Sequence, residues 1–204
     1  MRSILITVWA AALLTGASAN AQTARKTPPK KSDAEIRAAI DAHKADFDYL
    51  LGQWKFSAVS KEYGKFDGVW AAIKLPGGQL LDEYAVVDDK GEKVYVTTTL
   101  RAYNAVLDQW ELVGMDTGNG LNDTGTGHRT GGEVQIEQTF GVMGQQPSTL
   151  RIRYFNIKAD SFSWSADRSN DGGKTWISGF QTIEARRIGP ARTVQLFPAV
   201  PKSR

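Results

Sequence analysis

The feature that most constrains the fold is a succession of short segments that begins at Trp54. Each segment is rich in Val, Ile, Thr, Tyr, Phe and Trp, alternates apolar with polar residues, and ends near Gly, Asn or Asp. This alternation is typical of strands that bury one face, and the clusters are typical of turns. The pattern predicts strands over residues 53–60, 69–74, 79–87, 93–103, 109–115, 123–130, 133–140, 149–156, 161–168 and 174–187. About ten strands in sequential hairpins favour an all-β fold, an up-and-down antiparallel β-barrel.

One N-terminal helix is expected before the barrel, over residues 32–52. Ser32 and Glu35 have the spacing of a capping box, and Gly52 is a residue type that ends helices. The residues at helical spacing between them predict an apolar face that packs on the rest of the domain: Ile36, Ile40, His43, Phe47 and Leu50. His43 could serve as a ligand or a base, although a histidine at the edge of an apolar stripe is more often packed with one nitrogen in water.

The first residues have the features of a secretory signal. Arg2 precedes an apolar run over residues 4–14, and the small residues Ala19 and Ala21 suit a signal peptidase. The alternative, a membrane anchor, would need an apolar run of about 20 residues, and no second apolar run follows. We therefore expect residues 1–21 to be a signal peptide cleaved after Ala21, or else after Ala19, and the mature protein to be soluble and periplasmic or secreted.

Polar segments flank the expected barrel. Residues 22–31 are rich in Pro and Lys and indicate a flexible linker, and residues 189–204 indicate a C-terminal tail, which leaves residues 53–188 for the barrel. The formal net charge of the 204-residue chain is +3, and the basic excess lies in these two ends. Because nucleic-acid binding needs a stronger basic patch, we expect no nucleic-acid partner. The expected partner is a small molecule held in the barrel, and the oligomeric state is left open.

The composition argues against several kinds of site. The chain has no Cys, so it has neither disulfides nor a lipid-anchoring cysteine, and its stability must come from the core. It has no cluster of His and Cys for a metal, no G-x-S-x-G of a serine hydrolase and no glycine-rich loop for a phosphate. We therefore predict no cofactor and no metal, and nothing in these motifs indicates an enzyme.

One short motif is similar to the Asp-box of sialidases, S-x-D-x-G-x-T-W. It consists of Ser169, Asp171, Gly173, Thr175 and Trp176, and it falls between the last two predicted strands. At such a joint the carboxylate can accept backbone N–H bonds and the glycine can take a positive φ. An active sialidase would need several boxes, an arginine cluster and a nucleophilic tyrosine. We therefore interpret this box as a turn-forming device rather than part of a glycosidase.

The start and the end of the predicted barrel resemble lipocalins. Gly52, Gln53 and Trp54 match the G-x-W that begins the first lipocalin strand, and Arg186 and Arg187 lie on the last predicted strand. In lipocalins an arginine of the last strand stacks over that tryptophan. The resemblance implies that Trp54 and one of the two arginines close one end of the barrel.

Four motifs in order extend the resemblance over residues 47–188: "LLGQW", "LLDEY", "LRAYN…W" and "SxDGGKTW". Together they look most like lipocalin-like domains, of the calycin superfamily, in exported bacterial proteins. The resemblance implies a barrel with an internal cavity but names neither a ligand nor a reaction. The chain departs from typical lipocalins in lacking their disulfide and in having more than eight strands, closer to fatty-acid-binding proteins and nitrobindin.

A nitrobindin-like haem ligand could come only from His128, the one histidine of the predicted barrel. Nitrobindin-type barrels supply their histidine nearer the C-terminus, and the last predicted strand has none. His128 lies in a Gly-rich stretch near a hairpin tip, so we expect it to be exposed.

Several charged and aromatic residues lie where strand alternation could direct them inward. Glu83 and Arg101, on successive strands, form our candidate buried pair, because a lone buried charge is costly. The candidate ligand-binding residues are Glu83, Tyr84, Arg101, Trp110, Tyr154, Trp164 and Arg168. For each charged residue the alternative is a place on the outer face, and for each aromatic residue it is the core.

Two functions follow from such a cavity. The first is an exported carrier that binds a small, partly apolar molecule. The alternative is an enzyme that acts on a small molecule in the same cavity through a carboxylate and an arginine. A module that binds another protein through the open end of the barrel is a third hypothesis.

Overall fold

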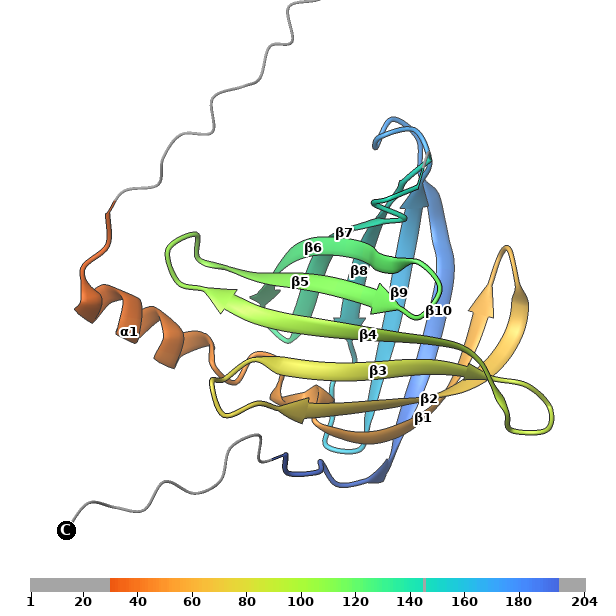
Figure 1. The fold of residues 1–204 in the computed structure, drawn as a ribbon, viewed down its shortest axis with the longest axis horizontal. Coiled ribbons are helices and arrows are strands. Elements are labelled where there is room, and N and C mark those ends of the chain that lie inside the picture. Colours follow the sequence, from red (N-terminus) through yellow and green to blue (C-terminus); the bar gives the residue numbers. More distant parts are fainter. Residues whose placement is uncertain (1–29, 145, 195–204) are drawn as a thin grey trace, which may run out of the picture.

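The computed structural model describes residues 30–144 and 146–194. The expected signal peptide and most of the expected linker therefore lie outside the described residues, as does the end of the tail. In the described part, ten antiparallel strands form one closed barrel (Figure 1). The strands are β1 (Gly52–Ser60), β2 (Gly64–Lys74), β3 (Leu80–Val87), β4 (Lys93–Asn104), β5 (Gln109–Asp116), β6 (Gly120–Thr130), β7 (Glu133–Phe140), β8 (Ser148–Phe155), β9 (Ser161–Ser169) and β10 (Ile177–Gly189).

Each strand pairs with its neighbours in sequence, and β1 pairs with β10 to close the barrel. The prediction of an all-β, up-and-down antiparallel barrel preceded by one helix is confirmed. Three strands begin three or more residues from their predicted starts: β2, β10 and β6, which begins at Gly120 rather than at Asp123. β2 begins at Gly64 because residues 64–68 continue the ladder with β1 up to the Ser60–Gly64 pair. β10 begins at Ile177 because the residues before it belong to the Asp-box turn.

The N-terminal helix is shorter than predicted. α1 (Asp33–His43) begins with the expected capping box, in which the Ser32 side chain accepts from the Glu35 N–H and the Ser32 N–H donates to the Glu35 carboxylate at 2.7 Å. The helix ends at His43 rather than at Gly52. His43 Nδ1 lies 2.8 Å from Asp46 Oδ2, within a turn that leads to the short 3₁₀ helix η1 (Asp48–Leu50).

The apolar stripe of this segment does not pack as one face. No residue of α1 is buried, and Ile40 remains 45% exposed, so the prediction that the helix packs on the domain is wrong for α1 itself. Only Phe47 and Leu50, which follow the helix, are fully buried. α1 extends from the barrel and lies beside the β4–β5 turn, where His43 stacks on Tyr103 with 4.7 Å between ring centroids (Figure 1).

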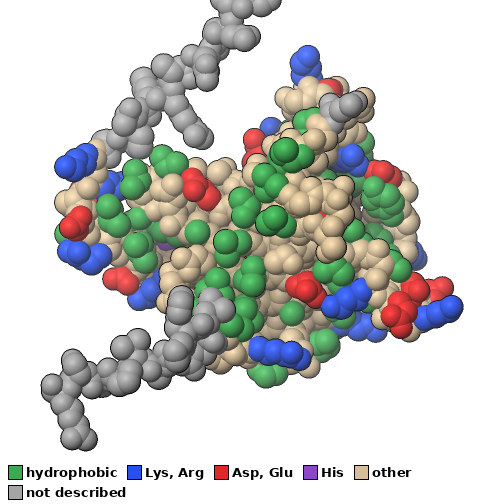
Figure 2. All heavy atoms as spheres, in the orientation of Figure 1, with side chains coloured by type: hydrophobic (Ala, Val, Ile, Leu, Met, Phe, Trp, Pro, Cys, Tyr) green, Lys and Arg blue, Asp and Glu red, His purple; other side chains and the backbone are tan. Residues whose placement is uncertain are grey.

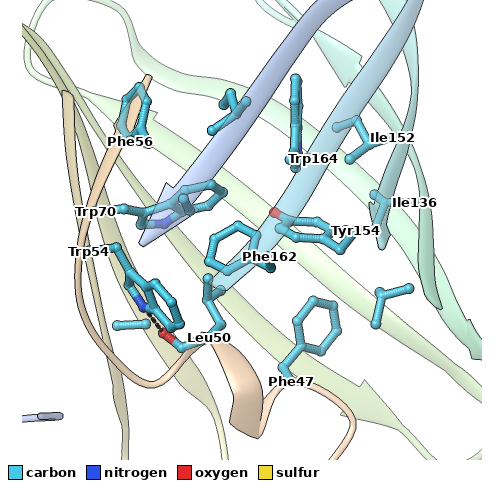
Figure 3. Packing of buried hydrophobic residues seen from close by; sticks show 14 of the residues in the cluster. Phe47, Leu50, Trp54, Phe56, Trp70, Ile136, Ile152, Tyr154, Phe162 and Trp164 are labelled. Carbon is cyan, nitrogen blue, oxygen red and sulfur yellow. Dashed lines mark hydrogen bonds between the residues drawn. The ribbon is translucent and has the colours of Figure 1, made fainter. Parts of the chain in front are cut away.

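The barrel end beside η1, called the closed end below, is filled by side chains. Trp54 is 0% exposed, and its Nε1–H donates to the Leu50 carbonyl at 2.8 Å (Figure 3). The Arg187 guanidinium lies 4.1 Å from the centre of the Trp54 rings. It donates to the carbonyls of Leu51, Tyr49 and Ala159 at 2.6, 3.2 and 2.8 Å. Arg186, one residue earlier, faces outward and is exposed, as strand alternation requires.

Aromatic rings pack against one another at this closed end. Phe47 meets Trp110 edge-on at 5.0 Å, and Trp54 meets Phe162 edge-on at 4.8 Å.

The outer surface carries both hydrophobic and polar side chains, dispersed among one another. Charged side chains gather at the tip of the β3–β4 hairpin (Figure 2). Among the described helices, none is long and apolar enough to cross a bilayer.

Candidate functional site

A cavity of about 600 Å³ occupies the barrel beyond the closed-end core. Its lining reaches Tyr63 in the β1–β2 turn and Asn119 in the β5–β6 turn, at the end opposite to Trp54 and Arg187. This end is called the open end below. A barrel of ten strands is wide enough to leave such a space above a filled core.

One wall of the cavity is polar, and the strand register explains why. Two neighbouring rows of residues cross the strands, two positions apart on each strand, so both rows face inward. The first row consists of Asp82, Thr99, Gly114 and Asp123, from β3 to β6. The second row consists of Leu80, Arg101, Leu112, Gly125 and Gln138, from β3 to β7. The polar members of both rows form what we call the polar wall.

Asp82 and Arg101 form a buried ion pair within the polar wall. Asp82 is 2% exposed and Arg101 is 3% exposed, and Arg101 Nη1 contacts Asp82 Oδ2. The other carboxylate oxygen of Asp82 accepts a hydrogen bond from Trp70 Nε1 at 2.7 Å. Because an unpaired buried charge costs several kcal/mol, each member of the pair requires the other.

Asp123 is a second buried carboxyl group in the same wall, and it is 2% exposed. Gln138 Nε2 donates to its Oδ1. The carboxyl group occupies the place of the missing side chain of Gly114, where a Cβ atom would overlap with it. Burial raises the pKa of Asp123 above its usual range, although the Gln138 hydrogen bond and the charge of Arg101 act in the opposite direction.

The rest of the lining is aromatic and aliphatic, and we call it the apolar wall. Its main residues are Trp70, Tyr84, Ile152, Tyr154, Trp164, Ala166 and Ile183 (Figure 3 shows part of it). Tyr84 meets Trp70 edge-on at 5.5 Å and stacks on Phe56 at 4.8 Å, so these rings are fixed by their neighbours. Burial raises the pKa of Tyr84 and Tyr154, so both phenols stay neutral at ordinary pH.

Most of the residues expected to bind a ligand line this cavity: Tyr84, Arg101, Tyr154, Trp164 and Arg168. Trp110 does not line it. It is 1% exposed in the closed-end core, where its Nε1–H donates to Asp46 Oδ2 at 3.1 Å. Trp110 therefore points into the barrel, as strand alternation predicts, but it belongs to the core and not to the cavity lining.

The expected pair of Glu83 and Arg101 is wrong. Glu83 faces outward, where Lys93 Nζ lies 2.7 Å from its carboxylate, and Asp82 pairs with Arg101 instead. The two acids are adjacent, so alternation allows only one of them inside.

Sequence reasoning missed Asp123, Thr99 and Gln138 as wall residues, and it chose Glu83 rather than Asp82 as the partner of Arg101. Alternation alone did not identify Asp82, because Leu80 and Tyr84 share its face while Leu81 and Ala85 share the face of Glu83. No signal marked Asp123, because it follows the turn residues of "DTGNGLND".

The Asp-box forms the β9–β10 turn at the open end. Asp171 accepts hydrogen bonds from the Thr175 hydroxyl at 2.6 Å and from the N–H groups of Thr175 and Lys174 at 2.9 and 3.0 Å. These bonds, those from Thr175 foremost, lower the pKa of Asp171 to about 2. Gly172 and Gly173 adopt φ of 71° and 87°, which L residues rarely take. The Asp171 side chain therefore holds the turn together, and it does not line the cavity.

Arg168 lies at the rim of the cavity beside this turn. Its Nη1 lies 2.5 Å from Glu62 Oε2, and its guanidinium lies 4.9 Å from the centre of the Phe180 ring. The two histidines lie elsewhere, His43 on α1 and His128 exposed on the outside of β6. In residues 30–144 and 146–194 no three His, Cys, Asp or Glu side chains are grouped so that they could hold a metal ion.

Comparison with known proteins shows the fold and not a family. No family model matches the chain, and no curated protein matches it. Among solved structures, that of Rv2717c from M. tuberculosis is similar over 74% of this chain and 97% of that chain, with a TM-score of 0.51 and 16% identity.

Two further solved structures match less well. The S-type phycobiliprotein lyase CPES from Guillardia theta matches over 82% of this chain and 100% of that chain, with a TM-score of 0.48 and 9% identity. The redesigned β-barrel mFAP1, solved bound to DFHBI, matches over 69% and 96%, with a TM-score of 0.37 and 12% identity. At 16% identity, the similarity to the mycobacterial protein shows the β-barrel fold alone.

Proposed function

We propose that this protein is an exported carrier that binds a small, partly apolar molecule inside its barrel. The observation that supports this proposal is an open cavity with one apolar wall and one polar wall. Its volume of about 600 Å³ lies within the range of roughly 300–1,000 Å³ that is typical of small-molecule sites. An apolar body would gain burial against Trp70, Tyr84 and Trp164, while its polar group would meet the wall of Asp82, Arg101 and Asp123.

The neighbours mFAP1, solved bound to DFHBI, and the phycobiliprotein lyase CPES have TM-scores below 0.5, so the argument for this chain rests on its own cavity. Export is the part of the proposal that rests on the sequence of residues 1–21 alone.

The contacts of the polar wall favour binding over catalysis. Asp82 is engaged with Arg101 and with Trp70, so this carboxylate cannot act on a substrate without breaking the buried pair. The enzyme hypothesis was built on Glu83 and Arg101, and Glu83 lies outside the cavity. A carrier requires only the cavity, which supports it as the simpler function.

The test is a fluorescence titration with Nile red, a neutral dye whose emission rises in apolar surroundings. We expect saturable binding with one site per chain. Ala166, on the apolar wall, is 1% exposed, and the variant Ala166→Phe places a ring in the cavity and should abolish dye binding. Ser165→Phe adds the same ring on the outward-facing neighbour and should leave binding unchanged. Absence of dye binding to the wild type, or equal binding to both variants, would overturn the proposal.

A further inference from the structure

The interior of the cavity holds one more acid than base. Two carboxyl groups, Asp82 and Asp123, share the polar wall with one guanidinium, Arg101. Arg101 contacts Asp82. Asp123 has no cationic group within 4.0 Å among the described residues. One buried carboxyl group is therefore left without a countercharge.

The other charged residues of the lining do not supply that countercharge. Arg168 lies at the rim and is paired with Glu62. Asp116, near the open end, is engaged in the β5–β6 turn, where it accepts hydrogen bonds from the N–H groups of Gly118 and Asn119 at 2.9 and 2.7 Å. Among the charged residues of the described lining, Asp123 is therefore the buried one that lacks a partner of opposite charge.

The surroundings of Asp123 leave one of its oxygens available. Gln138 donates to Oδ1, and no hydrogen bond from the described residues reaches Oδ2. The Gly114 niche holds the carboxyl group in place against β5. Because burial raises the pKa of Asp123, this carboxyl group gains from a bound proton or from any other positive charge that enters the cavity.

The rest of the lining suits an organic cation better than a metal ion. The faces of aromatic rings attract cations, most strongly when water is excluded, and the lining includes Trp70, Tyr84, Tyr95, Tyr154 and Trp164. A metal ion would need several oxygen or nitrogen ligands, and the part of the chain that the structure describes holds no such group. An ammonium group on an apolar body needs only one carboxylate and the surrounding rings.

We propose that the ligand is an amphipathic amine, whose protonated nitrogen pairs with Asp123 and whose apolar body lies against the aromatic rings of the apolar wall. This inference rests on the proposed carrier function and names the class of its ligand. Asp82 and Arg101 neutralise each other, so they leave the preference for positive charge to Asp123.

The experiment compares three indole probes of nearly the same shape: tryptamine, which is cationic, tryptophol, which is neutral, and indoleacetate, which is anionic. Each probe displaces Nile red from the wild type, from Asp123→Asn and from Glu137→Gln at about pH 7. Glu137 lies on the outer face of β7 with its side chain 66% exposed, so Glu137→Gln removes one negative charge without touching the cavity.

We expect the wild type to bind tryptamine at least about tenfold more tightly than tryptophol, as one desolvated charge pair allows, and indoleacetate most weakly. Asp123→Asn should lose the preference for tryptamine while its affinity for tryptophol stays similar, and Glu137→Gln should keep the preference. Tryptophol or indoleacetate binding as tightly as tryptamine, or a preference that persists in Asp123→Asn, would overturn the amine proposal and leave the carrier function intact. If neither the dye nor any probe binds the wild type, both proposals fail.

Discussion

The carboxyl group of Asp123, on β6, occupies the space that a Cβ atom of Gly114, on the neighbouring strand β5, would fill. The two residues are partners in the strand register, so the absence of a side chain on one lets the other fold across the strand. Glycine is unfavourable inside a strand, and its presence here is explained by the close approach of a neighbouring group.

Gly114→Ala should therefore destabilise the protein by about 1–3 kcal/mol, the usual cost of forcing an extra methyl group into a packed site. Urea unfolding measures this change. Asp123→Ala should remove most of the cost of Gly114→Ala, because the overlapping group is gone. Additive effects in the double variant would show that the two residues do not compete for this space.

Asp123→Asn should raise the free energy of unfolding at neutral pH. The folded-state pKa of Asp123 is raised above the unfolded value, so its ionisation opposes folding once the pH exceeds about 3.9, the ordinary pKa of an aspartate. The advantage of the variant should thus be absent below that pH and grow as the pH rises. Urea unfolding of both proteins across this range provides the measurement, and an advantage that is independent of pH would contradict the assignment.

Removal of Arg187 should cost far more than removal of Arg186. Arg187→Ala deletes three hydrogen bonds to backbone carbonyls and the stacking on Trp54, which together should contribute about 2–4 kcal/mol. Arg186→Ala changes an exposed residue and should stay within about 0.5 kcal/mol of the wild type. Similar losses in the two variants would show that closure of the barrel does not depend on this contact.

Asp171→Ala should lower the Tm by a few degrees at neutral pH and leave dye binding unchanged, because the carboxylate holds a turn and does not line the cavity. The pKa of Asp171 is lowered to about 2, so its contribution is complete above its unfolded pKa and is lost as the pH falls toward 2. The Tm difference from the wild type should shrink between about pH 4 and pH 2. A loss of binding at unchanged stability would instead indicate a functional box.

N-terminal sequencing tests the proposed export. The protein recovered from the periplasm or the medium should begin at Gln22 or at Asn20. An intact Met1 on the recovered protein would contradict a cleaved signal.

The barrel could be predicted because each strand has one face toward solvent and one toward the interior. Polar and apolar residues therefore alternate along each strand with a period of two. All ten predicted segments overlap the observed strands, and the G-x-W resemblance named Trp54 and the arginine pair. The outer and inner positions of neighbouring acids were harder to assign. Glu83 and Asp82 differ by one position, and the local pattern of partly apolar residues around them did not fix which one faces inward.

The helix was predicted too long because residues 36, 40, 43, 47 and 50 keep helical spacing across a turn. The spacing is the same whether residues 47 and 50 continue a helix or insert into a barrel end, so periodicity alone could not separate these cases. The niche between Gly114 and Asp123 depends on the register of two strands, which no single segment of sequence specifies.

The pairing of β1 with β10 has a consequence for how the molecule would yield to force. Every other strand pair is joined by a turn, whereas this seam joins strands from the two ends of the barrel sequence. β1 begins and β10 ends at the closed end, side by side, so tension applied to residues 52 and 189 would act across the ladder rather than along it. The strand pairs would then separate one after another, beginning with Gln53–Gly189 and followed by Trp54–Arg187, where the arginine also stacks on the tryptophan. The stacking of Arg187 on Trp54 therefore resists the separation of β1 from β10. Once these two strands part, the barrel opens between them, while the other strands stay paired with their neighbours in sequence.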